Sequence, residues 1–106
     1  MFNFVTFSKS KKINPILIKS NEYAWQIKHV NLVMNYLFEN DMIILGGDIL
    51  NKDLNYTYDN WFYEPCKNNL EDLKKSHEVS INFIKNYTKI HGENFLVVFV
   101  VKKASI

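Results

Sequence analysis

The sequence contains no arginine, because all 13 of its basic residues are lysines. Arginine is the residue that recognises phosphate and guanine through paired hydrogen bonds, so its absence argues against a nucleic-acid partner. The formal net charge of +2 is also too small to indicate binding to a polyanion. We therefore expect no nucleic-acid partner for this chain.

Cysteine and long apolar segments are also scarce. Cys66 is the only cysteine, which excludes an internal disulfide and a thiolate metal cluster. The longest apolar run, 95–101, has seven residues, whereas a membrane helix needs ~20. The N-terminal lysines follow the apolar residues, the reverse of their order in a secretory signal. We expect a single domain over residues 1–106 in the reducing cytoplasm, without membrane contact, metal or cofactor.

The small net charge hides an acidic middle third. Residues 1–28 carry five lysines and one acid, residues 29–64 one lysine and six acids, and residues 65–106 seven lysines and four acids. Such runs are often only a solvated surface. The alternative is that the acidic third faces a basic partner, because complementary charge steers association.

The first half of the chain predicts two strands and a helix. Residues 2–7 alternate loosely between apolar and polar, as a strand does. Residues 15–18 predict a short edge strand, since Pro15 cannot donate a hydrogen bond into a central ladder. Apolar residues then recur at helical spacing, which predicts a helix over about 28–39 that stops at Asn40-Asp41.

A second helix and a final strand complete the predicted domain. Asn69 is a candidate N-cap for a helix at about 70–90, and Gly92 lies where a C-cap belongs. The continuous apolar run 95–101 predicts a central, buried strand. The prediction is an α+β domain with two helices on an antiparallel or mixed sheet of about four strands. Its order is strand, optional edge strand, helix, two hairpin strands, helix, strand.

The hairpin contains two adjacent glycines. Residues 42–50 and 54–61 are its predicted strands, and Asn51-Lys52-Asp53 supplies the turn. Gly46 and Gly47 lie inside the first strand, where glycine is costly, so we predict a structural role for both. If the hairpin is centred near Lys52, the residues opposite these glycines are Tyr58 and Thr57. Room for a tyrosine ring is the favoured reason, and a bulge or a close partner backbone is the alternative.

The second hairpin strand is crowded with aromatic residues. Alternation divides it into two sets, which are Tyr56, Tyr58, Asn60 and Phe62, and Thr57, Asp59, Trp61 and Tyr63. If one set fills the core, the other exposes two aromatics beside a carboxylate, as interaction sites do. We predict that Asp59, Trp61 and Tyr63 are exposed and form a patch with Asp48. The alternative is that helices cover both faces of the sheet.

Catalytic motifs are not recognisable. The histidines His29, His77 and His91 have no ligand-like spacing, and His77 falls on the apolar stripe of a helix. No local context activates the Cys66 thiol. We therefore expect no enzyme. A small enzyme that uses Asp48 or Asp59 with His77, and an adaptor that assembles through a strand edge, are the alternatives.

Several motifs follow one another in a recognisable order. Ala24-Trp25 precedes a helix, Ile-Ile-Leu-Gly-Gly-Asp-Ile covers residues 43–49, and Tyr-Asp-Asn-Trp-Phe-Tyr covers residues 58–63. A helix ending in residues 84–87 and an apolar strand complete the order. Over roughly residues 21–101 the chain resembles the immunity protein 40 family of bacterial polymorphic toxin systems.

The resemblance implies a cytoplasmic protein that binds and neutralises a cognate protein toxin by occlusion. Together with the predicted patch, it gives a set of candidate partner-binding residues. These are Asp48, Asp59, Asn60, Trp61, Tyr63 and Trp25.

Overall fold

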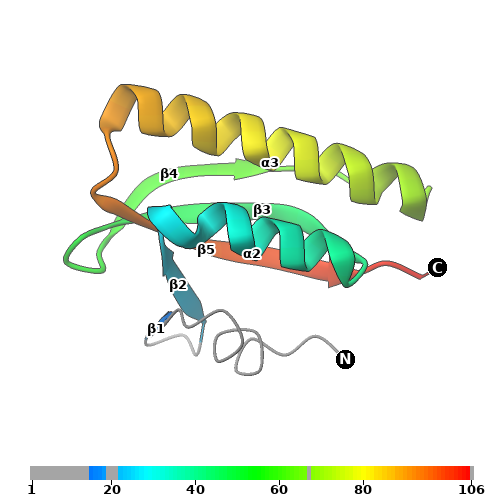
Figure 1. Cartoon of the computed structure of the whole chain (residues 1–106), viewed down its shortest axis with the longest axis horizontal. Coiled ribbons are helices and arrows are strands. Elements are labelled where there is room, and N and C mark those ends of the chain that lie inside the picture. The colour runs from blue at the N-terminus through cyan, green and yellow to red at the C-terminus, as the bar shows by residue number, and fades with distance from the viewer. Residues whose placement is uncertain (1–14, 19–21, 67, 106) are drawn as a thin grey trace.

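The computed structural model describes residues 15–18, 22–66 and 68–105. Within them, two helices pack on a five-stranded antiparallel sheet with the strand order β1-β2-β5-β3-β4 (Figure 1). The strands are β1 (Ile16–Leu17), β2 (Tyr23–Gln26), β3 (Met42–Asn51), β4 (Tyr56–Phe62) and β5 (Phe95–Lys103). The helices are α2 (Ile27–Glu39) and α3 (Asn69–His91). The predicted α+β class is confirmed, with one strand more than the four expected.

The additional strand is β2, which the sequence did not reveal. It runs directly into α2, and the helix N-cap Gln26 has extended backbone and makes no side-chain capping hydrogen bond. Since neither a turn nor a capping residue separates the two elements, Ala24-Trp25 looked like the approach to a helix. The predicted edge strand at residues 15–18 is confirmed as β1. The predicted strand at residues 2–7 lies outside the described residues.

The last strand, β5, is central, as predicted. It pairs with β2 on one side and with β3 on the other. Residues 95–99 are buried, but Val100 is 44% exposed and Val101 is only half-buried. The strand is therefore less completely buried than its continuous apolar run predicted, because Val100 lies on the face opposite the helices and Val101 lies at the margin of the helix-covered core.

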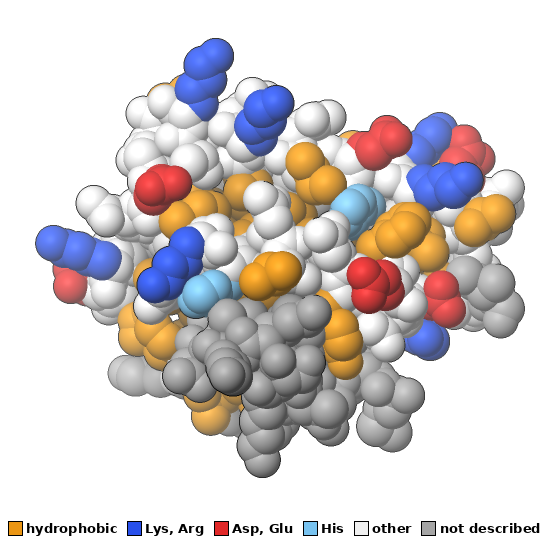
Figure 2. Space-filling view, in the orientation of Figure 1, with side chains coloured by type: hydrophobic (Ala, Val, Ile, Leu, Met, Phe, Trp, Pro, Cys, Tyr) orange, Lys and Arg blue, Asp and Glu red, His pale blue; other side chains and the backbone are white. Residues whose placement is uncertain are grey.

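Both helices lie on the same face of the sheet. Buried residues of α2, such as Val30, and of α3, such as Ile84, share one core cluster with Val97 of β5. The second helix is capped by Asn68, whose side chain accepts a hydrogen bond from the Glu71 N–H, and not by the predicted Asn69. On the helix-bearing side, lysines and acidic side chains are interspersed (Figure 2).

The described residues cover the opposite face of the sheet only in part. Leu50, Leu96 and Val98 are buried there and contact Ile16 and Ile18 of the segment around β1. This cluster lies over the β2–β5–β3 part of the sheet. The β4 side of the same face carries exposed large apolar residues instead. That half of the face is therefore the part with the most exposed apolar side chains among the described residues of the sheet.

Candidate functional site

Three of the four residues predicted to form a surface patch lie on the helix-covered side of β4. Asp59, Trp61 and Tyr63 share one face of the strand, as alternation predicts. Each makes a hydrogen bond to α3. Tyr87 Oη donates to Asp59 Oδ2 (2.7 Å), Trp61 Nε1 donates to Ser80 Oγ (3.0 Å), and Tyr63 Oη donates to Asp72 Oδ1 (2.7 Å). The predicted aromatic surface around Trp61 and Tyr63 is therefore wrong, because alternation does not reveal which face the helices cover.

Trp61 belongs to the core between β4 and α3. Its side chain is 7% exposed, and its indole stacks on the Phe83 ring with the centroids 4.9 Å apart. Gly47 lies opposite Trp61 on β3. A Cβ at Gly47 would lie 2.6 Å from Trp61 Cζ3 and 2.8 Å from the Val98 carbonyl oxygen. The glycine leaves room for an aromatic ring, but the ring is that of a tryptophan and not the predicted tyrosine.

The predicted pairing of the glycines was wrong by four residues. Gly46 pairs with Phe62 rather than Tyr58. Half of the error comes from the turn, since Asn51 bonds to Asn55 and the loop is centred on Asp53 rather than Lys52. The other half comes from a bulge. Between the pairs Leu50–Tyr56 and Asp48–Asn60, β3 has one residue and β4 has three, residues 57–59. Bulges of this kind leave no clear signature in a sequence.

Trp25 is also a core residue. Its side chain is 1% exposed and belongs to the cluster between the sheet and the helices. The indole lies next to the Tyr23 ring, with the centroids 6.4 Å apart. The prediction of Trp25 as a partner-binding residue assumed an exposed side chain, and the additional strand β2 places it inside instead.

The first turn of α3 is attached to the end of β4 through Asp72. This carboxylate is 1% exposed and accepts hydrogen bonds from Tyr63 Oη (2.7 Å), the Cys66 N–H (2.9 Å) and Cys66 Sγ (3.2 Å). The backbone hydrogen bond from Cys66 is the main reason that the pKa of Asp72 lies below its usual value. Burial, followed by the bond to Asp72, raises the pKa of Tyr63. We interpret this cluster as an anchor for the helix.

The uncovered half of the sheet presents the other alternating set of β4. Phe62 is 79% exposed, Tyr56 is 43% exposed, and Val100 lies across from Gly46 on the same face as Phe62. Asp48 and Asn60 are directly opposite each other between these apolar groups. We call the set on this surface the open patch, and it consists of Asp48, Tyr56, Tyr58, Asn60, Phe62 and Val100.

Gly46 keeps the middle of the open patch concave. A hollow of about 250 Å³ lies over it, with Phe62 and Val100 among the lining residues. The φ angle of Gly46 is 151°, which residues with a side chain rarely adopt, and an added Cβ would lie 2.9 Å from the Phe62 Cα. The glycine therefore holds the two strands close and leaves a depression between two exposed apolar side chains.

The open patch also carries acidic charge. Burial raises the pKa of Asp48 above its usual value, and the negative charge of Glu22 raises it further. Of the predicted partner-binding residues, Asp48 and Asn60 lie on this surface. Tyr56, Tyr58 and Phe62 were in the alternating set assigned to the core. Val100 gave no signal, because it belongs to a continuous apolar run.

The described residues offer little for metal chemistry. Within residues 15–18, 22–66 and 68–105, no three His, Cys, Asp or Glu side chains are grouped so that they could hold a metal ion. In the same part of the chain, no helix has the length and apolar character needed to span a membrane.

In this small α+β domain, the helices cover one face of the sheet, and the other face presents exposed aromatic side chains. The family model described as immunity protein 40 matches residues 11–101. The chain therefore belongs to the immunity protein 40 family. Searches of curated proteins and of solved structures gave no significant match.

Proposed function

We propose that this chain protects a bacterial cell by binding a cognate toxin domain through the open patch. Membership of the immunity protein 40 family supports this function. The observation that carries the proposal is Phe62, a phenylalanine side chain that is 79% exposed on an uncovered sheet face. An exposed aromatic costs solvation free energy in the isolated chain, and it is typical of residues that become buried against a partner.

The chemistry of the open patch suits protein recognition. Aromatic side chains are enriched where binding energy is concentrated, and a carboxylate beside them selects a complementary charge. Asp48 supplies that carboxylate next to Tyr56 and Phe62, in the acidic third of the sequence. The partner surface that complements it would be basic and partly apolar. Bound there, the chain would occlude the active site of the toxin or a surface near it, in the cytoplasm and without catalysis.

The strand edge is a weaker candidate for association. An adaptor that adds a strand to β4 would need a regular row of backbone groups. The bulge at residues 57–59 interrupts that row, and bulges at edges are a means of preventing strand addition. A partner that contacts side chains on the face is favoured over one that extends the sheet.

The test takes a candidate toxin domain from a gene beside this one and co-expresses it with the chain. We expect wild-type chain to restore colony formation and to form a stable complex with that domain. Phe62→Ala should weaken the complex by about thirtyfold, which corresponds to ~2 kcal/mol for a lost anchor. Ile90→Ala is the matched control, because Ile90 is also an exposed apolar residue (75%) but lies at the C-terminal end of α3. No protection by the wild type would refute the function, and full affinity of Phe62→Ala would move the binding face elsewhere.

A further inference from the structure

Tyr58 combines a strained backbone with an exposed side chain. Its φ angle is 70°, in the left-handed region that is unfavourable for residues with a Cβ and that glycine or asparagine adopts more readily. Its side chain is 89% exposed, so packing within the domain does little to offset that cost. Residues held in such sparsely populated backbone conformations cluster at functional sites.

The strain is held in place by the neighbouring residues of the bulge. Thr57 Oγ1 donates a hydrogen bond to the Ile49 carbonyl (2.9 Å) and accepts one from the Asp59 N–H (3.2 Å). Tyr87 of α3 fixes Asp59 in turn, through a hydrogen bond of 2.7 Å. The residues on both sides of Tyr58 are therefore hydrogen-bonded to β3 and α3, and the tyrosine is presented on a bulge that is held on both sides.

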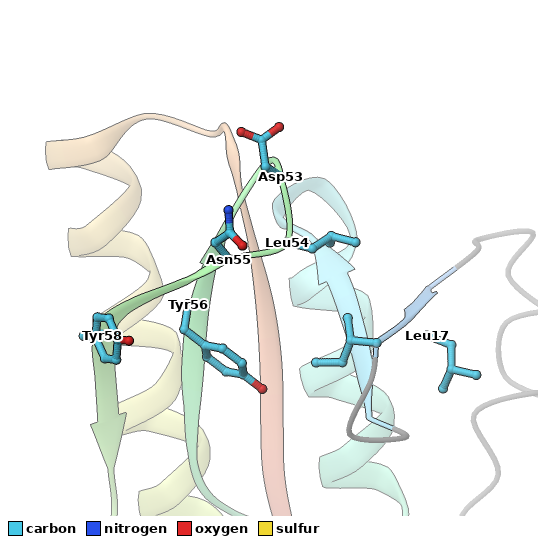
Figure 3. A pocket seen from close by; sticks show the side chains of 7 residues that line it. Leu17, Asp53, Leu54, Asn55, Tyr56 and Tyr58 are labelled. Carbon is cyan, nitrogen blue, oxygen red and sulfur yellow. The ribbon is translucent and has the colours of Figure 1, made fainter.

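Tyr58 forms one wall of a groove on the open side of the sheet. The groove has a volume of about 710 Å³. Tyr56 and Tyr58 line it from β4 and Leu17 lines it from β1. Asp53 and Leu54 lie at its hairpin-turn end, where the Asp53 carboxylate points outward from the turn (Figure 3). Leu17 is 59% exposed and Leu54 is 37% exposed, so both leave apolar surface for a ligand to cover.

The described residues that line the groove carry charge of one sign. Asp53 is the only charged residue among the described residues that line it. The neighbouring Lys52 lines a separate hollow together with Lys28 and Glu93, and so does not neutralise the groove from within. A groove with aromatic and aliphatic walls and a single carboxylate fits a side chain with an apolar stem and a cationic end.

We propose that the toxin domain inserts a lysine or arginine side chain into this groove, with Tyr58 as the wall against which it packs. This inference rests on the proposed function and adds the chemistry of the contact. The stem of the inserted side chain packs against Leu17 and Leu54, and its charged end lies beside the hairpin turn, where the outward-pointing Asp53 carboxylate attracts it. The left-handed backbone of Tyr58 then contributes to binding rather than to folding.

The experiment separates binding from folding. Binding of the toxin domain encoded beside the gene is measured by calorimetry at low and high salt, for wild type, Tyr58→Gly, Tyr58→Asn and Asp53→Asn. Glycine and asparagine both tolerate the left-handed backbone, so each Tyr58 variant should melt at or above the temperature of the wild type. We expect both to bind about thirtyfold more weakly. Asp53→Asn should bind about tenfold more weakly and lose part of the salt dependence.

The outcomes distinguish this inference from the function on which it rests. Ile90→Ala serves again as the control and should bind within about twofold of the wild type. Folded Tyr58 variants with unchanged affinity would overturn the groove as the contact while leaving the function intact. An Asp53→Asn variant with wild-type affinity and salt dependence would overturn the cationic side chain. Failure of the wild type to bind would overturn both proposals.

Discussion

The two faces of β4 contrast within a single strand. On one face, Asp59 and Trp61 bond to α3, and Trp61 is 7% exposed. On the other, Phe62 follows Trp61 directly in the sequence and is 79% exposed. The residues have similar chemistry, and only the alternation of the strand separates them. The contrast shows that the aromatic content of a strand says little about function until the helix-covered face is known.

The largest expected effect compares the two neighbours directly. Trp61→Ala should destabilise the domain by about 4 kcal/mol, because it removes a buried indole and leaves a cavity. Phe62→Ala should change the free energy of unfolding by less than about 0.5 kcal/mol, because its side chain is already in water. Urea denaturation followed by circular dichroism measures both. Equal destabilisation by the two variants would show that the faces do not differ as described.

A second test of the covered face concerns its tightest contact. Gly47→Ala should cost about 2–3 kcal/mol, since the new Cβ overlaps the indole of Trp61 and approaches the Val98 carbonyl. Trp61→Phe removes the ring atoms nearest to that Cβ. In the Trp61→Phe background, the denaturant midpoint should therefore fall less on Gly47→Ala than it does in the wild type. An identical fall in the two backgrounds would assign the cost to the backbone instead of the ring.

The smallest effect is expected on the open face, at Asp48. Burial and Glu22 raise its folded-state pKa, so the ionised carboxylate weakens the folded state at neutral pH. Asp48→Asn should melt slightly above the wild type at pH 7. That difference should shrink as pH falls through the raised pKa of Asp48, and vanish below the ordinary aspartate range near pH 3, where both states are protonated. A difference that stays constant with pH would mean that Asp48 ionisation does not cause it.

Local patterns predicted most of the architecture. Helical spacing located α2 and α3 to within a residue or two, and the apolar run located β5 as a central strand. These signals are local, because the pattern of apolar residues that defines a helix or a buried strand lies within the sequence of that element. Alternation also divided β4 correctly into two sets of side chains.

The failures were non-local. Which set of β4 faced inward depended on the side chosen by α3, a helix that begins seven residues after β4 ends. The pairing of Gly46 depended on a bulge and on the centre of a turn, each of which shifted it by two residues. Trp25 became a core residue because β2 joins the sheet without a turn or a cap before α2. The sequence could therefore give the β4 residues of the open patch only as one of two alternating sets.

The arrangement of β4 has a consequence for how the chain can change over generations. Substitutions at Tyr56, Asn60 or Phe62 would alter the proposed partner surface while the alternate residues keep α3 attached, so recognition would diverge at little cost to folding. An insertion or deletion between Asp59 and Phe62 would instead exchange inward and outward side chains, moving an aromatic out of the core and a polar group into it. This stretch should therefore accept changes of identity and reject changes of length. Length variation would be absorbed at the 52–54 turn.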